Sequence, residues 1–96
     1  MELIQNSSKC VILLHEIYGI NEHIKHYAIL LFQKGFDVYV PNLLQRSIPF
    51  SYEEEKVAYE NFITNVSFEN AKDQVNTLIN QIKKKYTHIC IIGFSV

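Results

Sequence analysis

The sequence predicts an α/β fold, an open parallel sheet with helices on both faces. Three short apolar runs, at residues 10–14, 36–40 and 89–94, have the length of buried strands. Stretches whose apolar residues recur with helical spacing separate these runs. Hydrophobic residues make up 48% of the 96 residues and charged residues 20%, which favours a packed core over a disordered chain. Strands that alternate with helices in this way form a parallel sheet.

The first strand, residues 10–14, is continuously apolar, as expected for a strand covered on both faces. Residues 2–5 are expected to add a short edge strand before it. His15 and Glu16 then bring polar groups to the carboxyl end of the first strand.

The most regular helix follows Asn21, a residue type that caps helix N-termini, and is expected to end at Gly35. Residues 36–40 form the second strand, which ends at Pro41 because proline cannot donate to a ladder. Strand, helix and strand make a βαβ unit, whose crossover is right-handed. The apolar stripe of the helix has i, i+3, i+4, i+7 and i+8 spacing and consists of Ile24, Tyr27, Ala28, Leu31 and Phe32.

Two further helices are expected before the third strand. Ser51 and Glu54 have the spacing of a capping box, which predicts a helix over residues 52–65. Ser67 caps the next helix, and the lysines at 83–85 complement its carboxyl end. The apolar stripe of this second helix consists of Ala71, Val75, Leu78, Ile79 and Ile82.

The order of the strands in the sheet is an assumption at this point. If the second and third strands flank the first, right-handed crossovers place the main helices on opposite faces. The carboxyl ends of the first and third strands then flank a topological switch point, where ligands bind in such sheets.

The third strand leads into Gly93-Phe94-Ser95-Val96, which supplies four of the five positions of a G-x-S-x-G nucleophile elbow. In an elbow, the strand turns sharply into a helix and exposes the serine hydroxyl. A strand that runs into an ordinary turn would give the same residues. The functional interpretation is preferred because residues 15–21 support it.

Composition and charge exclude several classes of protein. The net charge is -1 and the only basic cluster is residues 83–85, so no nucleic-acid partner is expected. No apolar run approaches the ~20 residues of a membrane span. Cys10 and Cys90 lie in apolar runs and no secretory signal precedes them, which favours a reduced, cytoplasmic protein. The oligomeric state stays open.

No metal or cofactor is expected. His15-Glu16 begins like the zinc motif H-E-x-x-H, but Gly19 stands where the second histidine must be. His23 and His26 are three residues apart on a helix but have no third ligand nearby, so they are interpreted as surface residues.

In combination, these motifs resemble the N-terminal half of the dienelactone hydrolase family, which belongs to the α/β hydrolases. The resemblance covers nearly the whole chain. It depends on the H-E-I-Y-G-I-N run within residues 11–21, on the elbow at 93–96, and on residues 34–36, 41–43, 50–55, 58–59 and 62.

The resemblance implies a three-layer α/β/α fold and the hydrolysis of a small ester or lactone, with no cofactor. Ser95 falls where the family places its nucleophile, and the backbone N–H groups of Ile17 and Val96 would form the oxyanion hole. Glu16 matches a supporting glutamate beside the nucleophile. In the best-known members that nucleophile is a cysteine, which the glutamate keeps quiescent, whereas this chain has serine.

The family's catalytic acid and histidine lie after the elbow. The 96 residues are therefore expected to form a single incomplete domain, truncated at the elbow and nearly inactive alone, whose reading frame continues with glycine and later an acid and a histidine. The strand from Ile89 would be an exposed apolar edge, which predicts poor solubility or oligomers.

Alternatives remain open. The chain could be a non-catalytic fragment or a flavodoxin-like binding module, although the loop after the first strand holds only Gly19 and so lacks a phosphate-cradling pattern. His15 is a second-choice base for Ser95. Four further side chains could line a pocket or simply pack, namely Tyr18, Tyr52, Tyr59 and Arg46.

Overall fold

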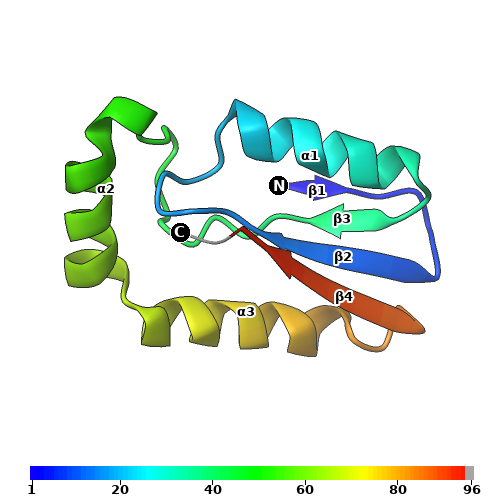
Figure 1. The fold of residues 1–96 in the computed structure, drawn as a ribbon. Coiled ribbons are helices and arrows are strands. Elements are labelled where there is room, and N and C mark those ends of the chain that lie inside the picture. The colour runs from blue at the N-terminus through cyan, green and yellow to red at the C-terminus, as the bar shows by residue number, and fades with distance from the viewer. Residues whose placement is uncertain (95–96) are drawn as a thin grey trace.

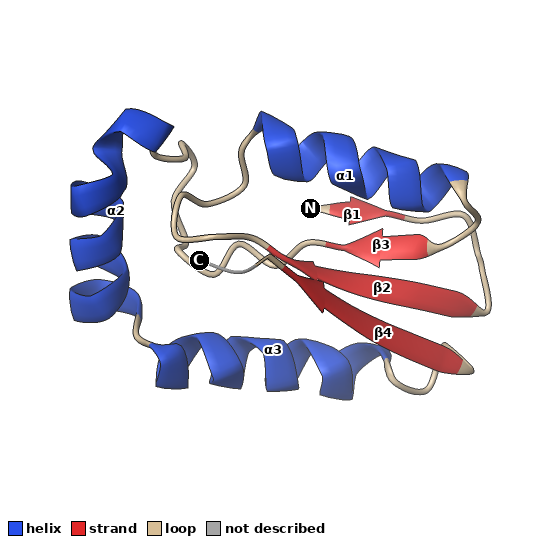
Figure 2. Ribbon diagram, in the orientation of Figure 1, coloured by secondary structure: helices blue, strands red, loops and turns tan. Residues whose placement is uncertain are grey.

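A four-stranded sheet carries helices on both of its faces in the computed structural model, which describes residues 1–94 (Figure 1; Figure 2). The strand order is β1-β3-β2-β4. In the chain, the strands are β1 (Glu2–Leu3), β2 (Lys9–Leu14), β3 (Asp37–Tyr39) and β4 (His88–Gly93).

Strand β2 is central, with β3 and β4 parallel to it on either side, which confirms the assumed order. The β2–β4 pairing runs from Lys9 opposite His88 to Leu14 opposite Gly93, so the carboxyl ends of the two strands are level. Strand β1 pairs antiparallel with β3. The predicted parallel sheet therefore describes β2, β3 and β4, and the short edge strand makes the whole sheet mixed.

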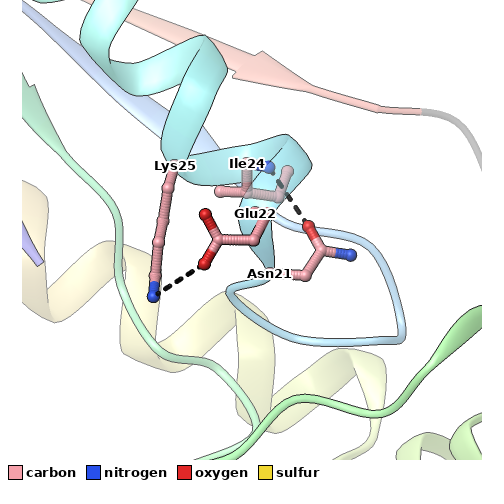
Figure 3. A network of polar contacts seen from close by, with 4 residues as sticks. All are labelled: Asn21, Glu22, Ile24 and Lys25. Atoms are coloured by element: carbon pink, nitrogen blue, oxygen red, sulfur yellow. Dashed lines mark hydrogen bonds and ion pairs between the residues drawn. The ribbon is translucent and has the colours of Figure 1, made fainter.

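Helix α1 (Glu22–Gln33) begins and ends as predicted. The Asn21 side chain caps it by accepting a 3.1 Å hydrogen bond from the N–H of Ile24, beside an exposed Lys25–Glu22 ion pair of 3.6 Å (Figure 3). Gly35, with φ of +101°, ends the helix because only glycine adopts this backbone without strain.

The predicted helix at 52–65 is not one regular α-helix. It begins as a 3-10 turn (Tyr52–Glu54), continues as α2 (Glu55–Asn61) and ends as a π-turn (Phe62–Val66). The capping box forms, since the N–H of Ser51 donates to the Glu54 carboxylate at 2.9 Å. The capping residues and helical spacing do not specify the π-turn, which the Ser67 N–H closes by donating to the Phe62 carbonyl.

Helix α3 (Phe68–Ile82) starts at Ser67, whose hydroxyl accepts a 3.2 Å hydrogen bond from the N–H of Asn70. Of the predicted apolar stripe, Leu78, Ile79 and Ile82 pack against the sheet, whereas Ala71 packs against the cluster that contains Ile17 and Ala58. Figure 1 shows α1 and α3 on opposite sides of the sheet, with α2 beyond the carboxyl ends of the parallel strands. The α1 side is packed by Leu13, Ile24, Ala28, Val38 and Val40, and the α3 side by Cys10, Ile12, Tyr39 and Ile82.

A polar cluster connects the segments at the amino ends of β2, β3 and β4. The buried Asp37 carboxylate accepts hydrogen bonds from the N–H groups of Gln5 (2.8 Å) and Ser7 (3.1 Å) and from the Tyr86 hydroxyl (2.6 Å). Burial acts to raise the pKa of Asp37, but these hydrogen bonds outweigh it and hold the pKa below its usual value. Burial also raises the pKa of Cys10 to about 11, so this thiol is an inert core group.

Strand β4 forms one edge of the sheet within residues 1–94. Cys90 is exposed on it, and Ile91 is 49% exposed. The edge carries no charged side chain that would discourage pairing with another strand. In the described part of the chain, no helix is long and apolar enough to span a membrane.

Candidate active site

A pocket of about 460 Å³ opens at the carboxyl ends of β2 and β4, which is the predicted switch point. This volume lies within the usual range of small-molecule sites, about 300–1,000 Å³. The end of β2, the loops after β2 and β3, the segment from α2 to α3 and the end of β4 all contribute to it. The lining residues are Leu14, His15, Glu16, Ile17, Leu43, Tyr59, Phe62, Ile63, Phe68, Ala71, Gly93 and Phe94.

His15 holds the loops around this pocket. Its Nε2 accepts a 2.9 Å hydrogen bond from the N–H of Leu43, so Nε2 carries no proton and Nδ1 donates to the Glu16 carbonyl at 2.6 Å. The side chain is 8% exposed, and burial lowers the pKa of His15 although the bond to Glu16 opposes this. Both ring nitrogens are engaged, so His15 is a structural residue rather than a base.

Two backbone hydrogen bonds and the conformation of Gly19 fix the turn after His15. The N–H of Gly19 donates to the Glu16 carbonyl at 3.1 Å, and the N–H of Phe50 donates to the Tyr18 carbonyl at 2.8 Å. Gly19 has φ of +95°, and a Cβ there would stand 3.2 Å from Leu44. This position therefore requires glycine.

The turn presents Ile17 to the pocket with a fixed backbone. Its side chain is buried, and its N–H donates no hydrogen bond to any atom within residues 1–94. The geometry is thus compatible with the expected oxyanion-hole role of Ile17.

Glu16 lines the same pocket as Gly93 and Phe94, the two residues that precede the expected nucleophile. The Phe94 ring packs edge-on against Tyr27 of α1, with ring centroids 5.0 Å apart, and this contact fixes the end of β4. Ser95 and Val96, the expected nucleophile and second oxyanion donor, lie outside the described residues. Their roles remain expectations.

Of the four further side chains considered from sequence, Tyr59 lines the pocket. Tyr18 and Tyr52 instead form a T-shaped pair with centroids 4.8 Å apart. The Arg46 guanidinium lies 4.0 Å from the centre of the Phe50 ring, and its Nε donates to the Ile48 carbonyl at 3.2 Å. Sequence reasoning missed the contributions of Phe62 and Phe68 to the pocket. No helical period relates these two residues, so the sequence held no simple signal for them.

No three His, Cys, Asp or Glu side chains within residues 1–94 converge to form a metal site. His23 contacts the Phe94 ring, with centroids 5.0 Å apart, and His26 is exposed.

These features define an α/β protein with a central parallel strand and a pocket at the switch point, the arrangement of a partial α/β-hydrolase fold. Residues 3–96 match the model of the dienelactone hydrolase family, and the chain belongs to this family, as the resemblance implied. It is 41% identical over 86 residues to the uncharacterized protein YczH of Bacillus subtilis (strain 168). The match covers 90% of this chain but 42% of that relative, so the chain spans less than half of the relative's length.

Proposed function

We propose that the protein encoded by the complete reading frame around residues 1–96, called the complete protein below, hydrolyses ester or lactone bonds of small carbonyl compounds. The observation that carries this proposal is the pocket at the carboxyl ends of β2 and β4, where Glu16, Ile17 and Gly93 meet. Membership of the dienelactone hydrolase family supports hydrolysis as the reaction.

In the proposed mechanism, Ser95 Oγ attacks the carbonyl carbon of the substrate. The carbonyl oxygen becomes an oxyanion, which the N–H groups of Ile17 and Val96 stabilise by hydrogen bonds. Collapse of this intermediate breaks the ester bond, and the alcohol leaves with a proton while the acyl group stays on Ser95. Water then attacks the acyl group, which releases the acid and regenerates the hydroxyl.

Ser95 needs a base to accept its proton, and His15 is unsuited because both of its ring nitrogens are engaged. We propose that the acid and the histidine of the triad lie outside these 96 residues in the complete protein, which is compatible with the chain spanning less than half of the length of the Bacillus relative. The 96 residues would then be one incomplete domain, nearly inactive alone. Glu16 would support the site from beside the nucleophile, and the free thiols Cys10 and Cys90 are compatible with a cytoplasmic location.

Steady-state hydrolysis of p-nitrophenyl butyrate by the complete protein tests this proposal. Ser95→Ala should lower kcat by about 10⁴-fold, the usual cost of removing a triad member. Ser8→Ala, which changes an exposed serine at the opposite end of β2, is the matched control and should leave kcat unchanged. Undiminished hydrolysis by the Ser95→Ala variant would rule out Ser95 as the nucleophile.

A further inference from the structure

The carbonyl group of Glu16 accepts two hydrogen bonds within the turn after β2. One comes from the Nδ1–H of His15 at 2.6 Å, and the other comes from the backbone N–H of Gly19 at 3.1 Å. Rotation of the Glu16 carbonyl about the backbone would break both bonds, and each is worth about 1 kcal/mol. The direction of this carbonyl is therefore fixed by a side chain and a backbone group of the same turn.

The Glu16 carbonyl belongs to the same peptide unit as the N–H of Ile17. This unit is planar and trans, so its C=O and its N–H point in opposite directions. Because the Glu16 carbonyl is directed into the turn, the Ile17 N–H is directed out of it. Both residues line the pocket at the carboxyl ends of β2 and β4. The hydrogen bond from His15 thus sets the direction of the N–H group that is expected to bind the oxyanion.

The imidazole ring of His15 is itself held in place. Its Nε2 accepts a 2.9 Å hydrogen bond from the N–H of Leu43, which leaves the ring proton on Nδ1, where it is donated to Glu16. The Leu43 carbonyl accepts a 3.0 Å hydrogen bond from the side-chain amide of Gln74 in α3. A chain of hydrogen bonds therefore runs from α3, through the loop after β3, to the peptide unit of Ile17.

The direction of the Ile17 N–H matters for the rate of the reaction as well as for folding. An oxyanion hole lowers the barrier when its donors are already aimed at the place where the negative charge develops. A peptide unit that had to rotate during the reaction would add to the barrier. A side chain that holds the unit in place can therefore speed the reaction without touching the substrate.

We propose that His15 is a positioning residue of the oxyanion hole, whose Nδ1–H holds the Glu16 carbonyl so that the Ile17 N–H faces the reacting carbonyl oxygen. The inference rests on the proposed function, because it requires an oxyanion formed by attack of Ser95. It goes beyond the stabilising role of His15. A ring that only joined two loops would affect folding and leave the turnover of each folded molecule unchanged.

Two substitutions of similar size separate these roles. The amide of His15→Asn ends near the position of Nδ1 and keeps a donor for the Glu16 carbonyl, whereas His15→Leu has none. Both side chains are too short to replace Nε2, so both lose the bond to Leu43. Circular dichroism establishes that each variant of the complete protein folds.

Steady-state hydrolysis of p-nitrophenyl butyrate measures the difference between the two variants. His15→Leu should lower kcat by about 100-fold, the lower end of the cost of losing one oxyanion donor, with KM changed by less than about threefold. The kcat of His15→Asn should be at least about tenfold higher than that of His15→Leu. His26→Leu, which changes an exposed histidine of α1, is the control and should leave kcat unchanged.

A trifluoromethyl ketone reports on the oxyanion hole more directly, because a serine adds to it and forms a tetrahedral adduct with a negatively charged oxygen. Its inhibition constant should rise in His15→Leu by the same factor by which kcat/KM falls. NMR of the wild-type complete protein remains informative if neither variant folds. The His15 ring should carry its proton on Nδ1 at neutral pH, and the Ile17 amide proton should shift downfield when the ketone binds.

Three results would overturn the proposal: equal kcat values in folded His15→Asn and His15→Leu, a neutral ring with its proton on Nε2, or an Ile17 amide that does not respond to the ketone. If the two kcat values are equal while Ser95→Ala is inactive, the positioning role fails and the proposed nucleophile stands. Full activity of Ser95→Ala would overturn the proposed function and this inference together.

Discussion

The imidazole Nε2 of His15 accepts a 2.9 Å hydrogen bond from the backbone N–H of Leu43. This bond joins the loop after β2 to the loop after β3, two segments separated by 28 residues in the chain. The same histidine donates to the Glu16 carbonyl and so sets the turn that carries Ile17. His15, the side chain that most resembles a catalytic base, therefore has a structural role in holding these loops.

His15→Ala should lower the free energy of unfolding by about 2–3 kcal/mol, because it leaves the buried N–H of Leu43 without a partner and removes a packed ring. Urea unfolding followed by circular dichroism, at concentrations where the protein is monomeric, measures the change. His26→Ala is the control, since His26 is exposed, and it should change the free energy by less than about 0.5 kcal/mol. A His15 variant as stable as the control would refute the structural role.

The contribution of His15 to stability should disappear as the pH falls. Its folded-state pKa lies below the unfolded value of 6.5, so the unfolded chain binds more protons as pH drops through this region. The stabilisation is complete above 6.5 and is lost as pH falls toward the folded pKa. The difference in unfolding free energy between wild type and His15→Ala, measured from pH 7.5 to 5, should therefore narrow toward low pH. A difference that widens toward low pH would contradict a lowered pKa of His15 in the folded protein.

Two substitutions of Ser67 should have different effects on the stability of the protein. Ser67→Gly relieves a backbone conformation that costs about 1–3 kcal/mol and loses only a few tenths from the cap, so it should be neutral or stabilising. Ser67→Ala keeps the strain and loses the cap, which should cost about 1 kcal/mol. Thermal unfolding of both variants checks the order. An alanine variant that is more stable than the glycine variant would show that the Ser67 backbone is not strained.

The open edge of β4 should make the 96-residue chain self-associate, because an uncharged apolar edge strand pairs readily with another strand. Ile91→Lys places a charge in the middle of this edge and should raise the monomer fraction in sedimentation velocity. Ile48→Lys adds the same charge to an exposed loop and should not. If the wild-type 96-residue chain sediments as a compact monomer, the prediction that it self-associates through this edge is wrong.

Much of the fold could be predicted because its signals are local. The stripe and caps of α1 and the apolar run of β2 each lie within a few turns or residues, and the structure confirms them. Local signals could not predict the antiparallel pairing of β1 with β3, which joins segments distant in the chain, or the π-turn before Ser67, which accompanies an unusual backbone conformation at Ser67 with φ of +69°. In the candidate site, the motif residues Glu16 and Ile17 are predicted from sequence and both line the pocket, whereas the Phe62–Phe68 contact follows the π-turn.

Covalent labelling of the complete protein by a fluorophosphonate, read by mass spectrometry, tests the central claim most directly. An activated serine in an oxyanion hole reacts with this reagent, whereas an ordinary surface serine does not. The account predicts one label, on Ser95, that disappears in Ser95→Ala and is nearly absent from the 96-residue chain alone. Labelling of a different serine, or equal labelling of the 96-residue chain and the complete protein, would contradict it.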